Sequence, residues 1–326
     1  GMKVFVTGGN GFIGSRVARG LVARGERVVG VDNFDPFYGR ARKEANLDHA
    51  RAGESEEGGG TFEFAEADVA DAPAVERVLK QAGGGTVVHL AARAGVRPSL
   101  EDPSGYARAN VLGTQVMLEA ARRAGCARFI MASSSSVYGN NDKVPFAETD
   151  DVSRPISPYA ATKRSCELIA HAHWHATGMP TACLRFFTVY GPGQRPDLAV
   201  HRFLERVGSG SPIEMYGDGS SRRDYTYIDD IVEGVLASME RIDAHGYRIW
   251  NLGNSDPVTL GDLVAVIERV TGRAARIERR PVPVGDVRQT WADPARSRAE
   301  LGFEPTTRLG DGVAAQWAWM RSAAPA

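Results

Sequence analysis

Short apolar runs rich in β-branched residues alternate with segments of helical period along much of the chain. The runs that we predict as strands are KVFVT, RVVGVD, TFEFAEAD, TVVHLAA, RFIMASS and TACLRFF. The helices that we predict between them lie near residues 11–24, 74–82, 104–124 and 158–176. Strands and helices that alternate in this way form βαβ units, in which the parallel strands are buried on both faces. The alternation therefore predicts an α/β fold built on a doubly wound parallel sheet.

The pattern changes at about Thr188, where Pro/Gly-rich turns such as VYGPGQRP and GSGSPIEMYGDGSS surround shorter elements. This change predicts a smaller C-terminal α/β lobe. The segments YIDDIVEGVLASME and WNLGN again have the character of core elements, so we expect the two lobes to interleave in the sequence. We predict a first domain of residues 1–187 plus about 224–254, and a second lobe of about 188–223 and 255–326.

Composition narrows the range of partners. The chain has 326 residues, and its 39 Lys and Arg nearly balance its 40 Asp and Glu. This balance gives no reason to expect a nucleic acid or an anionic membrane as partner, and no apolar run approaches the length of a membrane span. The chain enters its first strand directly, so we expect no secretory leader. Cys126, Cys166 and Cys183 form no CxxC pair, which favours free thiols in a cytoplasmic protein.

The stretch VTGGNGFIG follows the first predicted strand and opens the first predicted helix. Gly8, Gly11 and Gly14 have the spacing that lets a backbone turn tightly and approach a pyrophosphate closely. Phe12 and Ile13 lie in the same turn, and the N-terminus of the helix adds free N–H groups for an anion. Strand, glycine turn and helix in this order predict a dinucleotide site.

Acidic residues follow the second and third predicted strands. Asp32 ends the second strand, where a carboxylate can accept hydrogen bonds from an adenosine ribose and repel a 2′-phosphate. This position favours NAD over NADP, although the nearby Arg40 and Arg42 leave NADP open. Asp68 follows the third strand and is a candidate for contact with the adenine edge. The alternative for Asp68 is a helix N-cap ahead of APAVERVL.

The segment SPYAATK places Tyr159 and Lys163 at positions i and i+4, and therefore on one helical face. A cation one helical turn away favours the ionised form of a phenol, and a bound oxidised nicotinamide adds to the positive field. Such a tyrosine can take a proton from a sugar hydroxyl while hydride leaves the same carbon. We therefore predict Tyr159 as a catalytic base that is activated by Lys163.

The motifs GxxGFIG, HLAA, SSSSVYG, YAATK and RFFTVYGP occur in this order along the chain. In this order the chain resembles the extended short-chain dehydrogenase/reductase family of nucleotide-sugar-modifying enzymes, through SRRDYTYIDDI to GDVRQTWAD. The resemblance implies a Rossmann domain that binds NAD and a C-terminal lobe that holds a nucleoside diphosphate. It also implies that Ser134 bridges the C4 oxygen of the sugar and Tyr159. Further cofactor contacts that it implies are Val69, Leu90, Ala91, Ala92, Tyr159 and Lys163.

The serine run lacks an acid. Relatives that dehydrate a hexose carry an Asp-Glu pair just before VYG, and decarboxylating relatives carry a Glu there. This chain has Ser135 and Ser136 at those two places. A serine is too weak an acid to drive elimination, so a ketone formed at C4 is expected to survive and to take hydride back on its opposite face. The resemblance therefore implies 4-epimerisation, with no net change in NAD.

Two further stretches, LAARAGVRPSL and RFFTVYGPGQRPD, are similar to their counterparts in UDP-glucuronate 4-epimerases. Thr188 offers a hydroxyl and Arg195 a guanidinium, which together suit a C6 carboxylate. We expect Ser133 or Ser135 to assist them. Holding the carboxylate off the plane that loss of CO₂ requires is expected to protect the β-keto acid.

Several other arginines are candidates for contact with substrate, and some of them have structural alternatives. The resemblance carries Arg223 and Arg288 over as ligands of the diphosphate. Arg93 is predicted to contact substrate, although a solvated loop is an equal alternative for it and for Arg97. Arg185 is as well explained by a buried ion pair as by catalysis. Asp286 is a further candidate, for the ribose.

The expected function is thus a UDP-glucuronate 4-epimerase with bound NAD and no metal. The alternatives are a 4-epimerase of UDP-glucose or UDP-N-acetylglucosamine, a UDP-glucuronate decarboxylase, and an NAD-loaded binding or regulatory protein. The stretch HAHWH supplies a pair of histidines at i and i+4 but no third ligand, so we do not predict a metal site there. By analogy with the family, helices near 104–124 and 158–176 are expected to build a homodimer.

Overall fold

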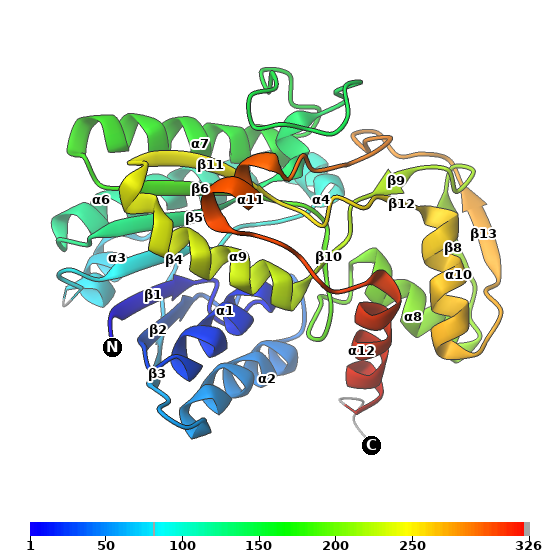
Figure 1. Cartoon of the computed structure of the whole chain (residues 1–326), viewed down its shortest axis with the longest axis horizontal. Coiled ribbons are helices and arrows are strands. Elements are labelled where there is room, and N and C mark those ends of the chain that lie inside the picture. The colour runs from blue at the N-terminus through cyan, green and yellow to red at the C-terminus, as the bar shows by residue number, and fades with distance from the viewer. Residues whose placement is uncertain (81, 323–326) are drawn as a thin grey trace.

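A seven-stranded sheet forms the centre of the protein in the computed structural model, which describes residues 1–80 and 82–322 (Figure 1). All of its neighbouring strands are parallel, and their order is β11-β6-β5-β4-β1-β2-β3. The strands of this sheet are β1 (Lys3–Thr7), β2 (Arg27–Asp32), β3 (Thr61–Glu66), β4 (Thr86–His89), β5 (Arg128–Ser134), β6 (Thr181–Phe186) and β11 (Tyr247–Leu252). The doubly wound parallel sheet expected from the alternating pattern is therefore confirmed.

Helices cover both faces of the sheet, as Figure 1 shows. The helices on one face are α1 (Phe12–Ala23), α2 (Arg40–Arg51) and α9 (Ile228–Arg241), and those on the other are α3 (Ala72–Leu79), α6 (Gly113–Arg123) and α7 (Pro158–Thr177). Each set packs its apolar side on the sheet and makes a separate core. Both faces are buried, which explains why the strands read as continuous apolar runs instead of alternating ones.

Two segments differ from their predicted form. Helix α2 is absent from the prediction, because its sequence RARKEANLDHAR has few apolar residues to mark a buried stripe. The helix predicted at 104–124 is divided into α5 (Pro103–Tyr106), a π-helical segment η2 (Ala107–Leu112) and α6. The wider turns of η2 bring Asn110 inward, where its side chain is buried.

The second lobe has its own small core. Its elements are β8 (Ile213–Tyr216), β9 (Arg222–Arg223), β12 (Val258–Thr259), β13 (Ile277–Arg280), α8 (Ala199–Ser209), α10 (Leu260–Thr271) and α12 (Leu309–Ser322). The remaining short elements are β7 (Val189–Tyr190), β10 (Thr226–Tyr227), α4 (Val96–Glu101), α11 (Ala295–Leu301) and the tight helical turns η1 (Ala52–Ser55), η3 (Ser135–Tyr138) and η4 (Ile242–Ala244). Apolar side chains of α8, β8, α10 and α12 meet in this core. The chain returns to the large sheet for α9 and β11, whose Trp250 is fully buried; the residue bounds of the two lobes stay a prediction.

The order of the strands fixes where a ligand can bind. The chain runs from β1 outward through β2 to β3, and then crosses to β4 on the other side of β1. In sheets of this kind ligands bind at the carboxyl ends of the strands, at the point where the order reverses. Gly8 follows β1, and a Cβ on Gly8 would lie only 3.0 Å from the backbone nitrogen of Ala91, which follows β4.

Within the described residues, no helix is both long and apolar enough to cross a membrane. The three cysteines are buried and unpaired.

Candidate active site

A cavity of about 630 Å³ lies at the carboxyl ends of the central strands and extends to residues of the second lobe. The predicted cofactor residues that line it are Gly8, Gly11, Phe12, Ile13, Gly14, Asp32, Asp68, Val69, Leu90, Ala91 and Ala92. The predicted catalytic and substrate residues that line it are Tyr159, Lys163, Ser133, Ser134, Ser135, Arg93, Thr188, Arg195 and Arg223. Of the predicted site residues, Arg288 alone does not line the cavity.

The glycine turn is too tight for side chains. A Cβ on Gly14 would lie 2.0 Å from the carbonyl oxygen of Gly8, and one on Gly9 would lie 2.7 Å from the Cα of Gly30. Gly8 has a φ of +72°, a conformation that L-residues rarely adopt. The turn thus offers bare backbone at the N-terminus of α1, which fits the pyrophosphate of a dinucleotide.

The carboxylate of Asp32 faces the same cavity from the end of β2. It accepts hydrogen bonds from the backbone N–H groups of Asn33 at 2.8 Å and Phe34 at 3.3 Å. Burial raises the pKa of Asp32, an effect that the nearby ammonium of Lys43 partly offsets. A carboxylate fixed in this way fits a ribose diol and disfavours a 2′-phosphate.

Asp68 is not the N-cap of α3. That role belongs to Asp71, whose side chain accepts from the N–H of Ala74 at 3.2 Å. Asp68 instead accepts from the N–H of Ala70 at 2.9 Å and from Arg108 at 2.8 Å, at the edge of the cavity. Of the two interpretations of Asp68, the position at the cavity remains.

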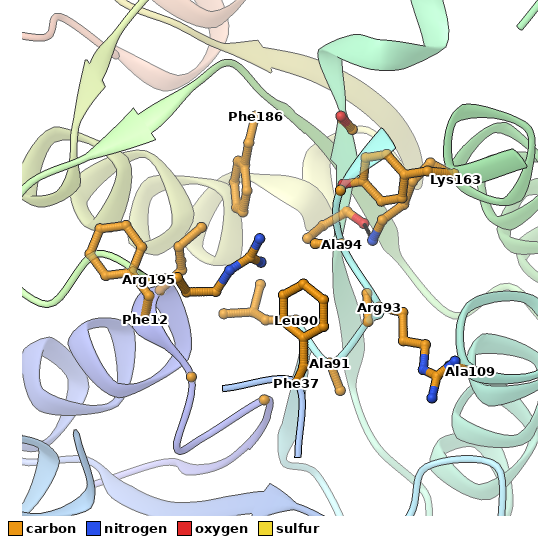
Figure 2. Close-up of a pocket in the computed structure, with 18 of the residues that line it drawn as sticks. Phe12, Phe37, Leu90, Ala91, Arg93, Ala94, Ala109, Lys163, Phe186 and Arg195 are labelled. Atoms are coloured by element: carbon orange, nitrogen blue, oxygen red, sulfur yellow. Dashed lines mark hydrogen bonds between the residues drawn. The ribbon is translucent and has the colours of Figure 1, made fainter. Parts of the chain in front are cut away.

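Tyr159 and Lys163 lie in the first two turns of α7 and line the cavity, and Figure 2 shows the labelled Lys163 pointing into it. Lys163 is buried, and its Nζ donates to the carbonyl oxygen of Ala132 at 2.9 Å. Ser134 ends β5, and its Oγ accepts the N–H of Ser136 at 3.1 Å. The hydroxyl proton of Ser134 therefore remains available for another acceptor.

A buried carboxylate ties α7 to the two strands beneath it. Glu167 accepts from the hydroxyl of Ser133 at 2.7 Å, from Arg185 at 2.8 and 2.9 Å, and from Arg164 at 2.8 Å. Burial opposes the ionised form of Glu167, but these donors outweigh it and lower its pKa. Of the two interpretations of Arg185, the buried ion pair is the one present. Ser133 lines the cavity, but its hydroxyl proton is committed to Glu167.

The turn after β5 presents hydroxyl groups alone. Ser135 and Ser136 begin η3 and line the cavity with Ser134. The acidic residues that line the cavity are Asp32, Asp35, Asp68, Asp102 and Asp286. None of these described acids comes from β5, η3 or the start of α7. In the structure as in the sequence, serine side chains therefore occupy the positions at which those relatives carry acids.

Arg195 and Thr188 reach the cavity from the segments around β7. The guanidinium of Arg195 points into the cavity (Figure 2) and is held by Asp197 through contacts of 3.0 and 2.8 Å. Its Cζ lies 5.4 Å from the ring centre of Phe37. Burial alone would lower the pKa of Arg195, but Asp197 raises it above its usual value.

Arg223 lies at the far end of the cavity, on β9. The next residue, Asp224, is fully buried and accepts the N–H groups of Asn254, Ser255 and Ala292 at 2.8–2.9 Å. This hub fixes the backbone that carries Arg223. Burial lowers the pKa of Arg223, so an anionic ligand there would relieve a cost of desolvation.

Two other arginines lie apart from this set. Arg288 is exposed and lines a separate hollow of about 40 Å³ with Asn140 and Asn141. The structure therefore does not place it with Arg223 in the main cavity. The guanidinium carbon of Arg97 lies 3.9 Å from the ring centre of Tyr216, and its Nη2 lies 3.4 Å from a carboxylate oxygen of Asp286. These two contacts join the two lobes. Arg97 therefore neither lines the cavity nor lies free in a solvated loop.

Residues 4–253 match the NAD dependent epimerase/dehydratase family. This span includes the glycine turn, the serine turn, Tyr159 and Lys163. The chain belongs to this family. The membership agrees with the expected extended short-chain dehydrogenase/reductase fold, and the dinucleotide fits the bare turn and Asp32 described above.

Relatives cover the chain from end to end. It is 39% identical to a probable UDP-glucuronate 4-epimerase of Rhizobium meliloti, over 98% of this chain and 96% of the relative. It is 37% identical to the UDP-glucuronate 4-epimerase of Thermodesulfobacterium geofontis, over 97% and 95%. The structure of a UDP-glucuronic acid 4-epimerase from Bacillus cereus, in complex with UDP-glucuronic acid and NAD, matches with a TM-score of 0.90 and 33% identity, over 98% of this chain and 99% of that one. The expected Rossmann fold is confirmed.

Several residues around the site were not predicted. Glu167 lies four residues after Lys163 and eight after Tyr159, so its position on the same helical face was a usable signal. Asp197 and Asn110 carry no comparable pattern in the sequence. Within residues 1–80 and 82–322, no group of three His, Cys, Asp or Glu side chains could hold a metal ion.

Gly14→Ala is expected to weaken NAD binding about five- to hundredfold, because overpacking of this kind costs about 1–3 kcal/mol. The matched control is Gly39→Ala, since a Cβ on Gly39 meets nothing within 4 Å. Calorimetric titration of NAD into stripped protein measures both affinities. An unchanged affinity in Gly14→Ala would contradict the assignment of this turn.

Proposed function

We propose that the protein is a UDP-glucuronate 4-epimerase, which interconverts UDP-glucuronic acid and UDP-galacturonic acid through a transient 4-keto sugar. One observation carries this proposal. Ser134, Ser135 and Ser136 face the cavity beside Tyr159 and Lys163, and the acids of dehydrating and decarboxylating relatives are replaced there by hydroxyl groups. The similarity to UDP-glucuronate 4-epimerases along the whole chain supports the same function.

Proton transfer falls to the residues of α7 and β5. The phenol oxygen of Tyr159 accepts the proton of the sugar C4 hydroxyl as the ketone forms, and returns it when the ketone is reduced. Lys163 donates to Ala132, which fixes its ammonium in the cavity lining that it shares with Tyr159. Ser134 orients the C4 oxygen through its free hydroxyl proton.

When bound, NAD supplies a hydride acceptor that later becomes the donor, so the net reaction is an isomerisation. The glycine turn, Asp32 and Asp68 would hold it. Inversion requires that the ketone turn over and present its opposite face. The serine turn contains no group acidic enough to protonate a leaving hydroxyl or to divert the ketone by elimination, so hydride return is the step left to it.

The uronate carboxylate is assigned to Thr188 and Arg195, with help from Ser135. Arg195 already points into the cavity, and a guanidinium can bind a carboxylate through two parallel hydrogen bonds. Asp197 holds this guanidinium from behind. Arg223 is assigned to the diphosphate. Ser133 is withdrawn from the carboxylate site, because its hydroxyl proton goes to Glu167.

Purified protein incubated with UDP-glucuronate, without added NAD, is expected to form UDP-galacturonate, which NMR identifies directly. UDP-pentose with released CO₂ would instead mean decarboxylation. Conversion of UDP-glucose with no turnover of the uronate would make the enzyme a neutral-sugar epimerase. NAD binding without conversion of either sugar would point to a regulatory protein.

Arg195→Met is expected to lower kcat/KM for UDP-glucuronate about ten- to hundredfold more than for UDP-glucose, because it removes a charged hydrogen-bond donor to the carboxylate. The control is Arg202→Met, since Arg202 pairs with Glu214 at 3.5 Å and lies outside the cavity. Equal losses for both sugars would show that Arg195 serves the diphosphate or the fold.

We further propose a homodimer formed through η2, α6 and α7. Leu112 and Leu168 are large aliphatic side chains that are 47% and 55% exposed on this side of the sheet. Sedimentation of the wild type is expected to give twice the chain mass of 35.1 kDa, and Leu112→Glu with Leu168→Glu to give the monomer. The control Val282→Glu, at a residue 62% exposed in the second lobe, should leave the dimer intact.

A further inference from the structure

The segment between β2 and α2, residues 33–38, crosses the cavity without belonging to the glycine turn or to the serine turn. Asp35, Phe37 and Tyr38 of this segment line the cavity. The side chain of Phe37 is nevertheless 46% exposed, and few other large aromatic side chains among the described residues are exposed to this degree. A residue that lines a cavity and is half exposed lies at its rim. We call residues 33–38 the strap.

Ion pairs join one end of the strap to the loop that follows β4. Asp35 lies 3.6 Å from the Nε of Arg93, and Arg93 also pairs with Asp102. Lys43 of α2 donates to the backbone carbonyl of Asp35. The carboxylate of Asp35 accepts the N–H of Phe37 at 2.9 Å, so the same residue shapes the strap and links it.

The anchor on the other side of the cavity is rigid. The backbone N–H of Arg93 donates to Asn110 at 2.8 Å, and Asn110 returns a bond to the carbonyl of Arg93 at 3.0 Å. Asn110 is 1% exposed and donates to Thr162 of α7 at 3.0 Å. The π-helical turn η2 thus holds Arg93 against the catalytic helix, and the charged side chain of Arg93 alone is left to reach the strap.

The tip of the strap meets the substrate side. The ring of Phe37 lies 5.4 Å from the guanidinium carbon of Arg195, and Figure 2 shows Phe37 between Arg195 and Arg93. The strap therefore runs from Asp32, at the ribose position, across to both arginines. The strap and the glycine turn line the same cavity, so we expect the strap to contact a molecule bound along that turn.

We propose that the strap, locked by Asp35, Arg93 and Asp102, retains the dinucleotide between turnovers. This inference rests on the proposed function, because an epimerase that released its dinucleotide before returning the hydride would lose the ketone. The locking groups are each about a third to a half exposed, and ion pairs that are exposed to this degree are individually weak. Such a lock is weak enough to open for loading and strong enough to slow escape.

The experiment measures release of NAD from loaded protein in the absence of any sugar, with free NAD trapped by an excess of a coupling dehydrogenase. Arg93→Met removes both ion pairs and is expected to speed release about two- to thirtyfold. Asp35→Asn keeps an acceptor for the N–H of Phe37, removes only the charge, and should speed release less. The double variant should be no faster than Arg93→Met, because both changes open the same lock.

Salt supplies a second readout. Release from the wild type should accelerate as ionic strength rises, and release from Arg93→Met should not, since exposed ion pairs are screened. The matched control is Arg123→Met, which also removes two exposed ion pairs, with Glu76 and Glu119, but lies away from the cavity. It should release NAD at the wild-type rate.

Unchanged release in Arg93→Met, with a raised KM for UDP-glucuronate, would overturn the proposal and return Arg93 to the substrate. A wild type that binds no NAD would overturn it as well. Because release is measured without sugar, rapid loss of NAD in Arg93→Met supports the strap even if the sugar assay finds a substrate other than UDP-glucuronate.

Discussion

The buried carboxylate of Glu167 is the contact on which the geometry of the site depends. It joins α7 to Ser133 of β5 and to Arg185 of β6, while Lys163, one turn earlier, donates to Ala132 of β5. Tyr159 begins the same helix, and Ser134 ends the same strand. Their separation is therefore set by hydrogen bonds that lie below the cavity. Breaking such a buried pair by removal of one partner leaves an uncompensated charge, which costs about 3–5 kcal/mol.

The residues that line the cavity above this contact form two groups, which come from different parts of the chain. Under the proposed function, backbone groups at the glycine turn and carboxylates after β2 and β3 form the dinucleotide side of the cavity, and arginines from the second lobe form the nucleotide-sugar side. The serine turn and α7 lie where the two sides meet. Under the proposed function, the choice between elimination, decarboxylation and epimerisation is confined to two positions, Ser135 and Ser136, which leave the dinucleotide side untouched.

Sequence reasoning succeeded where a single period or motif dominates. RFIMASS and RVVGVD became β5 and β2 with the predicted bounds, because strands buried on both faces are continuous apolar runs. It failed for α2, which buries only a few apolar side chains such as Leu47 and Ala50 and is also held by Asn46 and Lys43 contacting the loops. The sequence could not predict the ion pairs of the strap and of Arg97, for a related reason. Their partners, such as Asp286, lie far away in sequence, and a pair of opposite charges leaves no local pattern. Arg288, which lies outside the cavity that Arg223 lines, stays a prediction, since a motif fixes the place of a residue along the chain but not the direction of its side chain.

The position of β11 has a consequence for biosynthesis. This strand completes the sheet beside β6, yet sixty residues, from the second lobe and α9, are made between them. On the ribosome, β6 therefore presents an open hydrogen-bonding edge until Leu252 has emerged, and an exposed edge of this kind invites association with other chains. Because β11 follows the second lobe in the sequence, cleaving the chain at one place cannot release the complete central sheet as a fragment. A functional protein divided into two chains would need both chains synthesised together.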